Sequence, residues 1–226
     1  FNALYDETGS KKYVLLISHE MNLTGAPIAL GYFAESLQRQ GYQPIIACRH
    51  DDVFKNQLLD KGIPVIIFSL IYTSKLIPLN THLFKFIVIN TIVGAPLISQ
   101  LSGMTIPVLW WIHEAVVSYH PGALQTMPHI VSKNIHIYCG GSYAEMVLHQ
   151  FRPEYAIKQL LYYVPDYSGI ENSNHSMLSN TNGKKVFGMI GMQEKRKGYD
   201  VLTCAILNLP KNILNDCYFV FVGKTC

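Results

Sequence analysis

A run of three cations, residues 195–197 (KRK), stands directly before a helical pattern that begins at Gly198. Cations beside the positive end of a helix dipole are unfavourable, and a bound polyanion would relieve that cost. Lys197 offers phosphate oxygens a point charge, and the guanidinium of Arg196 offers a forked contact. These residues indicate either a diphosphate site or a solvated basic turn, and taken alone they favour neither.

A second anion-binding feature is expected where the loop 19–26 (HEMNLTGA) leads into a helical pattern. Gly25 lets the backbone approach a ligand closely, and a helix N-terminus attracts phosphate. The alternative is that Gly25 only eases a tight turn. The GxGxxG fingerprint of dinucleotide-binding proteins is missing here.

His113 and Glu114 follow the apolar run 107–112 (PVLWWI), where a strand would end. They are well placed for ligand contact, although a lone histidine is more often structural than catalytic. The other histidines lack metal-ligand spacing, and Asp51-Asp52 is expected on a solvated turn, so we predict no metal site.

Alternating strand and helix patterns position these residues. One apolar face predicts a helix from about Ala26 to the stop at Gly41, and Ser142 with Glu145 suggests a capping box. Residues 69–83 are expected to form a loop or an irregular helix. The other expected helices are 53–60, 94–101, 142–151 and 198–209, and the expected strands are 13–18, 43–48, 64–68, 86–90, 107–112, 135–139, 185–190 and 217–222.

This alternation predicts the α/β class, with a Rossmann-like parallel sheet, right-handed crossovers and helices on both faces. Ligands of such sheets bind beyond the carboxyl ends of the strands. The loops after Ser18, Asn90, Ile112 and Ile190 are therefore the ones expected to carry function.

Two domains are predicted. Residues 1–167 form a Rossmann-like domain, residues 168–183 an exposed Ser- and Asn-rich linker, and residues 184–226 one βαβ unit, which cannot complete a domain alone. The chain starts at Phe1 and stops at Cys226 directly after a strand, so we expect it to be part of a longer polypeptide.

Composition narrows the class of protein. A net charge of +3 is too small to indicate nucleic acid, and it suits an anionic small molecule or an anionic membrane face. No apolar run approaches the roughly 18 residues of a membrane span, and no signal peptide is evident. The irregular spacing of the cysteines indicates reduced residues, with Cys48, Cys139 and Cys217 in the core. We expect a cytoplasmic protein, with peripheral contact at the inner membrane face left open.

The combined motifs resemble family 4 of the retaining glycosyltransferases of the GT-B fold. The segments concerned are YVLLIS, TGAP, FIVINT, WWIHE, KVFGMIG, RKG and YFVFVG, which extend over almost the whole chain. WWIHE and RKG are the more specific ones. The resemblance implies two Rossmann-like domains that face each other across a cleft, of which the first mostly holds the acceptor and the second mostly holds the sugar nucleotide.

The resemblance also implies residue roles. Gly25 and Ala26 would offer amides near the diphosphate, His113 would contact the donor sugar, and Lys197 would bind the diphosphate. Family members often carry an arginine where this chain has Met192, and Arg196 can take its place.

The activity implied is transfer of a sugar from a nucleotide-diphosphate sugar to a hydroxyl of a saccharide or glycolipid acceptor, with retention and without cofactor or metal. The setting implied is bacterial-type polysaccharide or glycoconjugate synthesis. The family's paired glutamates would lie beyond Cys226, so we expect these residues alone to be inactive. The sequence predicts no oligomeric state.

Three alternatives remain at this point. A sugar-nucleotide epimerase shares the architecture but needs catalytic acids that we cannot assign. A non-enzymatic module that binds a nucleotide sugar or a partner would keep the fold only. A nicotinamide-dependent dehydrogenase is disfavoured by the missing glycine fingerprint.

Overall fold

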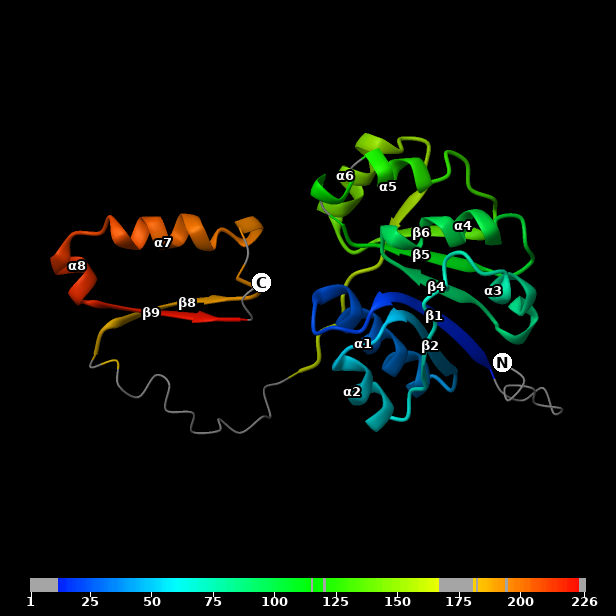
Figure 1. Ribbon diagram of the computed structural model, residues 1–226, viewed down its shortest axis with the longest axis horizontal. Helices are drawn as coiled ribbons and strands as arrows, with labels where there is room; N and C mark the ends of the chain where they lie inside the picture. Colours follow the sequence, from blue (N-terminus) through cyan, green and yellow to red (C-terminus); the bar gives the residue numbers. More distant parts are fainter. Residues whose placement is uncertain are drawn as a thin grey trace. The chain divides into compact units, whose positions relative to one another are not determined.

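The computed structural model describes residues 12–114, 116–119, 121–166, 181, 183–193 and 195–223, with the backbone alone at positions 117 and 196. The chain divides into two compact units, Phe1–Asp166 and Tyr167–Cys226 (Figure 1). Each unit is described by itself. The predicted linker 168–183 lies outside the described residues except at positions 181 and 183.

The first unit is built on a seven-stranded sheet in the order β3-β2-β1-β4-β5-β6-β7. Every neighbouring pair is parallel, as the sequence predicts for a Rossmann-like fold. The strands are β1 (Tyr13–Glu20), β2 (Gln43–His50), β3 (Val65–Ile67), β4 (Ile87–Asn90), β5 (Val108–Ile112), β6 (Ile135–Cys139) and β7 (Ile157–Gln159). The sequence did not predict β7, and β1 runs two residues further than predicted, so His19 and Glu20 belong to the strand.

Helices cover both faces of this sheet, because alternate strand residues point to opposite sides. On one face Val14 and Leu16 pack with α1 (Gly25–Arg39) and α2 (Phe54–Asp60). On the other face Leu15 and Ile17 belong to the cluster that includes α4 (Ala95–Leu101) and α6 (Ser142–Phe151). Figure 1 shows the two sets of helices on either side of the strands.

Among the shorter elements, residues 69–83 form an irregular segment as predicted, whereas the segments beside α4 and between β5 and β6 differ from the predictions. Residues 69–83 contain α3 (Leu76–Leu79) and the 3-10 turn η2 (Thr81–Leu83). The turn η3 (Ile92–Gly94) precedes α4, and η4 (Val116–Ser118) and α5 (Pro121–Thr126) fill the β5–β6 connection, where no helix was expected.

The capping box at the start of α6 is wrong. The N-cap is Gly141, and Ser142 is already the first helical residue, with no side-chain cap. The hydroxyl of an N-cap serine accepts from a backbone amide two or three residues further on. Ser142 lies one position inside the helix, so its hydroxyl is not placed to accept from that amide. Glu145 accepts a hydrogen bond from Gln159 Nε2 at 2.7 Å instead.

The second unit contains the parallel pair β8 (Lys185–Ile190) and β9 (Cys217–Val222), as predicted. Between them lie η6 (Lys195–Lys197), α7 (Tyr199–Leu207) and α8 (Lys211–Asn215). No described residue of this unit is buried. Its apolar side chains are therefore largely in contact with water, in contrast to the first unit.

Two further expectations concern the cysteines and membrane-spanning helices. Cys48 and Cys139 are buried and free, as predicted, whereas Cys217 is only half-buried because the second unit has no closed core. None of the described helices has the length and apolarity that crossing a membrane requires.

Candidate functional site

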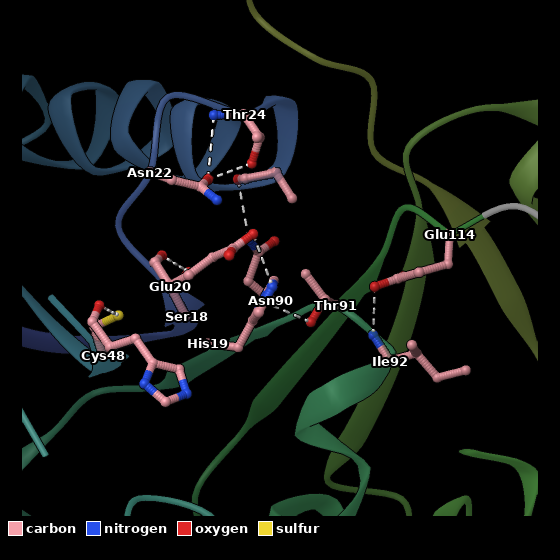
Figure 2. A network of polar contacts seen from close by, with 12 residues as sticks. Ser18, His19, Glu20, Asn22, Thr24, Cys48, Asn90, Thr91, Ile92 and Glu114 are labelled. Atoms are coloured by element: carbon pink, nitrogen blue, oxygen red, sulfur yellow. Dashed lines mark hydrogen bonds and ion pairs between the residues drawn. The ribbon is translucent and has the colours of Figure 1, made fainter. Parts of the chain in front are cut away.

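The carboxyl ends of β1 and β4 mark the switch point of the sheet. These strands are neighbours, yet the chain leaves β1 through α1 on one face and β4 through α4 on the other. Open parallel sheets bind ligands in the crevice that this divergence creates. Figure 2 shows polar side chains from several of these strand ends converging there.

Asn90, the last residue of β4, connects two of the predicted site elements. Its side chain is buried, and its Nδ2 donates a hydrogen bond to the carbonyl of Ala26 at 3.0 Å (Figure 2). Its Oδ1 lies 2.5 Å from Nε2 of His113. Asn90 therefore holds the first turn of α1 and the end of β5 together.

These contacts determine the tautomer of neutral His113. The Ala26 carbonyl can only accept, so the Asn90 amide must point its NH₂ group there and its oxygen at His113. Nε2 of His113 must then carry the proton, and Nδ1 must accept. The Tyr162 hydroxyl, 2.8 Å from Nδ1, is the donor.

The surroundings of His113 keep it neutral. Its ring stacks on Tyr162, with centroids 5.3 Å apart, and lies 4.7 Å from the ring of Trp111. Burial lowers the pKa of His113 to about 4. A neutral imidazole whose two nitrogens are both bonded to protein groups has no free nitrogen with which to act as a general base.

Glu114 stabilises the turn that follows β4 through hydrogen bonds to the backbone. Its Oε1 accepts from the amide of Ile92 at 2.9 Å, and its Oε2 accepts from the amide of His113, also at 2.9 Å (Figure 2). Burial raises the pKa of Glu114, while these amide hydrogen bonds oppose the rise. With both oxygens bonded to backbone, Glu114 fixes the loops rather than serving as a free catalytic acid.

Thr91, between Asn90 and Ile92, has a left-handed backbone with φ 74°. A β-branched residue in this region costs on the order of 1–3 kcal/mol and persists only where its surroundings impose it. The Thr91 amide donates to the Trp111 carbonyl at 2.8 Å, and Trp110 Nε1 donates to the Thr91 carbonyl at 2.9 Å. The turn is thus locked against β5.

His19 and Glu20 at the end of β1 complete the cluster. His19 Nε2 lies 3.0 Å from Glu20 Oε1, and its Nδ1 lies 3.5 Å from Thr91 Oγ1 (Figure 2). Burial lowers the pKa of His19, although Glu20 opposes the shift. The sequence placed both residues in the loop that was expected to carry function, but it predicted no role for either side chain, and the structure places them in β1.

The start of α1 leaves two amides for a ligand. Thr24 is the N-cap and makes no side-chain cap; Asn22 Oδ1 accepts from its amide and hydroxyl. The first amides of a helix have no intrahelical acceptor, and Pro27 has no amide proton. The first hydrogen bond of the helix runs from the Ile28 amide to the Thr24 carbonyl. The amides of Gly25 and Ala26 precede it and are the donors that remain.

The structure removes one explanation for Gly25. Its φ is not positive, so the backbone there does not require glycine. A Cβ added at Gly25 would meet no atom within 4 Å, so protein packing does not require glycine either. The simple tight-turn interpretation of Gly25 is therefore disfavoured, and the backbone at this helix start is open on the side where a Cβ would stand.

A cleft of about 610 Å³ opens beside this cluster at the carboxyl edge of the sheet. His19 and Glu114 form part of its wall. Arg49 from β2, Tyr72 from the β3–α3 connection, and residues of η3, α4 and α5 complete it. No local pattern in the sequence indicates this cleft, because its walls come from segments widely separated in the chain.

Lys195 and Lys197 belong to η6 of the second unit, where both are exposed. Gly198, with φ 77°, is the N-cap of α7. The side chain of Arg196 lies outside the described residues. His113, Gly25 and Ala26 are thus brought together in the first unit, while Lys197 and Arg196 are part of the second.

In the described portion of the chain, no group of three or more His, Cys, Asp or Glu side chains could hold a metal ion.

The model of a family described as Glycosyl-transferase family 4 matches residues 10–151. That range includes β1 to α6 and contains Gly25, Ala26, Asn90, His113 and Glu114. No curated protein matches the chain.

Proposed function

Because the chain belongs to glycosyltransferase family 4, we propose that it forms the acceptor-side domain and the first βαβ unit of the donor-side domain of a retaining GT-B glycosyltransferase. The proposed reaction moves a sugar from a nucleotide-diphosphate sugar to an acceptor hydroxyl. The acceptor would be a saccharide or a glycolipid, in polysaccharide or glycoconjugate synthesis at or near the cytoplasmic face of a membrane.

The observation that carries this proposal is the bridge made by Asn90. It holds the helix start that offers the Gly25 and Ala26 amides next to His113, at the switch point of the sheet. Amides at a helix N-terminus suit a diphosphate, and Nδ1 of the neutral His113 would accept from a sugar hydroxyl in place of the Tyr162 hydroxyl that it now accepts from. Both groups would be needed by an enzyme that binds a nucleotide-diphosphate sugar.

The proposed mechanism is electrostatic. As the bond from sugar to diphosphate breaks, negative charge develops on the leaving phosphate oxygens. The amides of Gly25 and Ala26 would stabilise that charge from the first unit, and Lys197 with Arg196 from the second. The proposal requires no bound metal or cofactor.

The second unit supports the donor-side assignment in a different way. Phe187 and Phe219 stack across β8 and β9 at 5.5 Å, yet Phe187 is 51% exposed. Apolar strands this exposed are expected to pack against further layers. In the proposed enzyme, further βα units of the donor domain would cover them.

Transfer can be tested with the natural protein that contains this sequence. It is incubated with labelled UDP-, GDP- and ADP-sugars, with simple saccharides as acceptors, and nucleoside diphosphate release is measured. We expect release with at least one donor, and a product whose anomeric configuration by NMR equals that of the donor. An inverted product would contradict retention, and the absence of release with every donor would contradict the transferase assignment.

The variant Gly25→Ala sharpens this test. The added methyl group would stand where a diphosphate approaches the backbone, so we expect at least a tenfold loss in donor turnover. Alanine in the first helical turn should leave folding stability unchanged or raise it by about 0.5–1 kcal/mol. Gly141→Ala is the matched control, because this glycine also lies at a helix start with no atom near its Cβ position. Equal activity of the two variants would remove Gly25 from the donor site.

A further inference from the structure

The cleft beside the switch point contains one cation without a carboxylate partner. Arg49 is exposed at the end of β2 and lines the cleft. Among the described residues it makes no ion pair. A guanidinium that projects into a cleft without a counter-ion is a ready site for an anion.

Three carboxylates at the neighbouring strand ends are engaged elsewhere. Glu114 is bonded through both oxygens to backbone amides, Glu20 is paired with His19, and Asp51 is paired with Lys55. The charge of Arg49 is therefore left for a ligand.

Tyr72 supplies a second, independent indication. Its side chain is only 6% exposed and lines the same cleft, and its hydroxyl has no hydrogen-bond partner among the described residues. An unpartnered buried hydroxyl costs about 1–3 kcal/mol, and native proteins seldom leave one without a reason. The hydroxyl oxygen itself is buried, so an anion held by Arg49 would offer it the acceptor that it lacks once the Tyr72 side chain turns towards the cleft.

The remaining walls suit a sugar. Thr73, Ser118 and Thr126 contribute hydroxyl-bearing side chains, and Pro96 and Ala123 contribute small apolar surfaces. The cleft volume of about 610 Å³ falls within the usual range for small-molecule sites, roughly 300–1,000 Å³. Hydroxyl groups beside flat apolar surfaces match the two kinds of surface that a pyranose ring presents.

We propose that this cleft binds the acceptor, and that Arg49 selects an acceptor sugar with an anionic group, either a carboxylate or a phosphate. The inference rests on the proposed transferase function. Arg49 and Tyr72 would bind the anionic group, and the sugar ring would lie along the wall formed by η3, α4 and α5.

Binding to the 226-residue chain is measured without any donor, by titration calorimetry or saturation-transfer NMR. The probes are glucuronate, galacturonate and glucose 6-phosphate, each compared with its neutral sugar. We expect at least one anionic sugar to bind at least tenfold more tightly than its neutral counterpart. Whether the uronates or the phosphate show the larger preference identifies the anionic group.

The variants assign the preference to residues. Arg49→Gln should abolish it, whereas Lys158→Gln should preserve it, because Lys158 is an exposed cation on β7, which four strands separate from β2. Tyr72→Phe should weaken binding of the anionic sugar at least threefold without loss of folding stability, since it removes an unpartnered hydroxyl.

Three results would overturn the inference. The first is equal binding of charged and neutral sugars, and the second is a preference that survives Arg49→Gln. The third is binding of inorganic phosphate as tight as that of glucose 6-phosphate, which would show an anion site with no part for the sugar. None of these results depends on donor turnover, so a failure here is distinguishable from a failure of the transferase assignment.

Discussion

The two regions expected to meet a diphosphate are built in opposite ways. In the first unit the strand ends are tied together by buried polar side chains, with Asn90 and Glu114 each bonded to two partners. In the second unit the turn with Lys197 is exposed and follows a strand without a buried residue. The first region can set geometry, because its groups cannot move independently. The second can mainly supply charge.

This difference predicts which substitutions affect stability and which affect only binding. Removing a group from an interlocked polar cluster leaves buried partners unsatisfied. Removing an exposed cation leaves nothing unsatisfied, because water solvates its neighbours. Both tryptophans, Trp110 and Trp111, lie in β5, so their fluorescence reports unfolding of the first unit alone.

The largest effect is expected for Asn90→Ala. It removes both side-chain hydrogen bonds of a buried residue, so that the first turn of α1 loses its bond to β4 and His113 Nε2 loses its acceptor. We expect a loss of about 2–4 kcal/mol in the free energy of unfolding of the first unit, measured by urea titration with tryptophan fluorescence.

Asn56→Ala is the control for this prediction, because Asn56 is exposed on α2. Its loss should stay within about 0.5 kcal/mol. In Asn90→Ala the ¹⁵N shifts of His113 should also lose the signature of a single Nε2–H tautomer. Equal stabilities of the two variants, with the tautomer retained, would show that Asn90 does not hold the two elements together.

A smaller effect is expected from pH. Folded His113 has a pKa of about 4 instead of 6.5, so the unfolded chain takes up its proton first as the pH falls. The contribution of His113 to stability is therefore complete above pH 6.5 and is lost as the pH falls towards 4. Allowing for its partial exposure, we expect this loss to be about 2 kcal/mol.

Two neighbours complicate the pH profile, and a variant separates them. Burial raises the pKa of Glu114, so its contribution has the opposite sign and falls as the pH rises above the ordinary carboxyl value. His19, with a lowered pKa, acts in the same direction as His113. His113→Gln keeps a donor towards Asn90 but cannot titrate, so the wild-type profile minus that of the variant isolates His113. Parallel profiles between pH 4 and 6.5 would mean that His113 is not held neutral.

How far the sequence predicts this site depends on the range of the interactions. Continuous apolar runs such as 107–112 identified the central strands, because strands covered on both faces need apolar residues throughout. The strand end at Asn90 was singled out, but not the role of its side chain. That role depends on Ala26 and His113, which lie 64 and 23 residues away in the chain.

Local patterns gave wrong predictions where their interpretation depended on the residue at which a helix or strand begins. Ser142 and Glu145 have the spacing of a capping box, but α6 starts one residue too early for it. β7 is only three residues long at the sheet edge, which is too short to show the alternation of apolar and polar residues that identifies a strand. The cleft with Arg49 and Tyr72 had no signal in the sequence, because no local pattern records which separate loops fold onto one another.

The smallest effect on stability, and the sharpest contrast with Asn90, is expected for Lys197→Ala. Lys197 is exposed, so the change in unfolding free energy should stay within about 0.5 kcal/mol, measured by circular dichroism. Affinity for inorganic pyrophosphate, measured by calorimetry on the same chain, should fall about three- to tenfold. This fall should be larger at low ionic strength, because an exposed charge is screened by salt.

Lys211→Ala is the matched control, since Lys211 is also an exposed lysine of the second unit, at the start of α8. If both variants lost affinity equally, the attraction would come from the net charge of the unit, and the turn before α7 would have no specific part in binding the diphosphate.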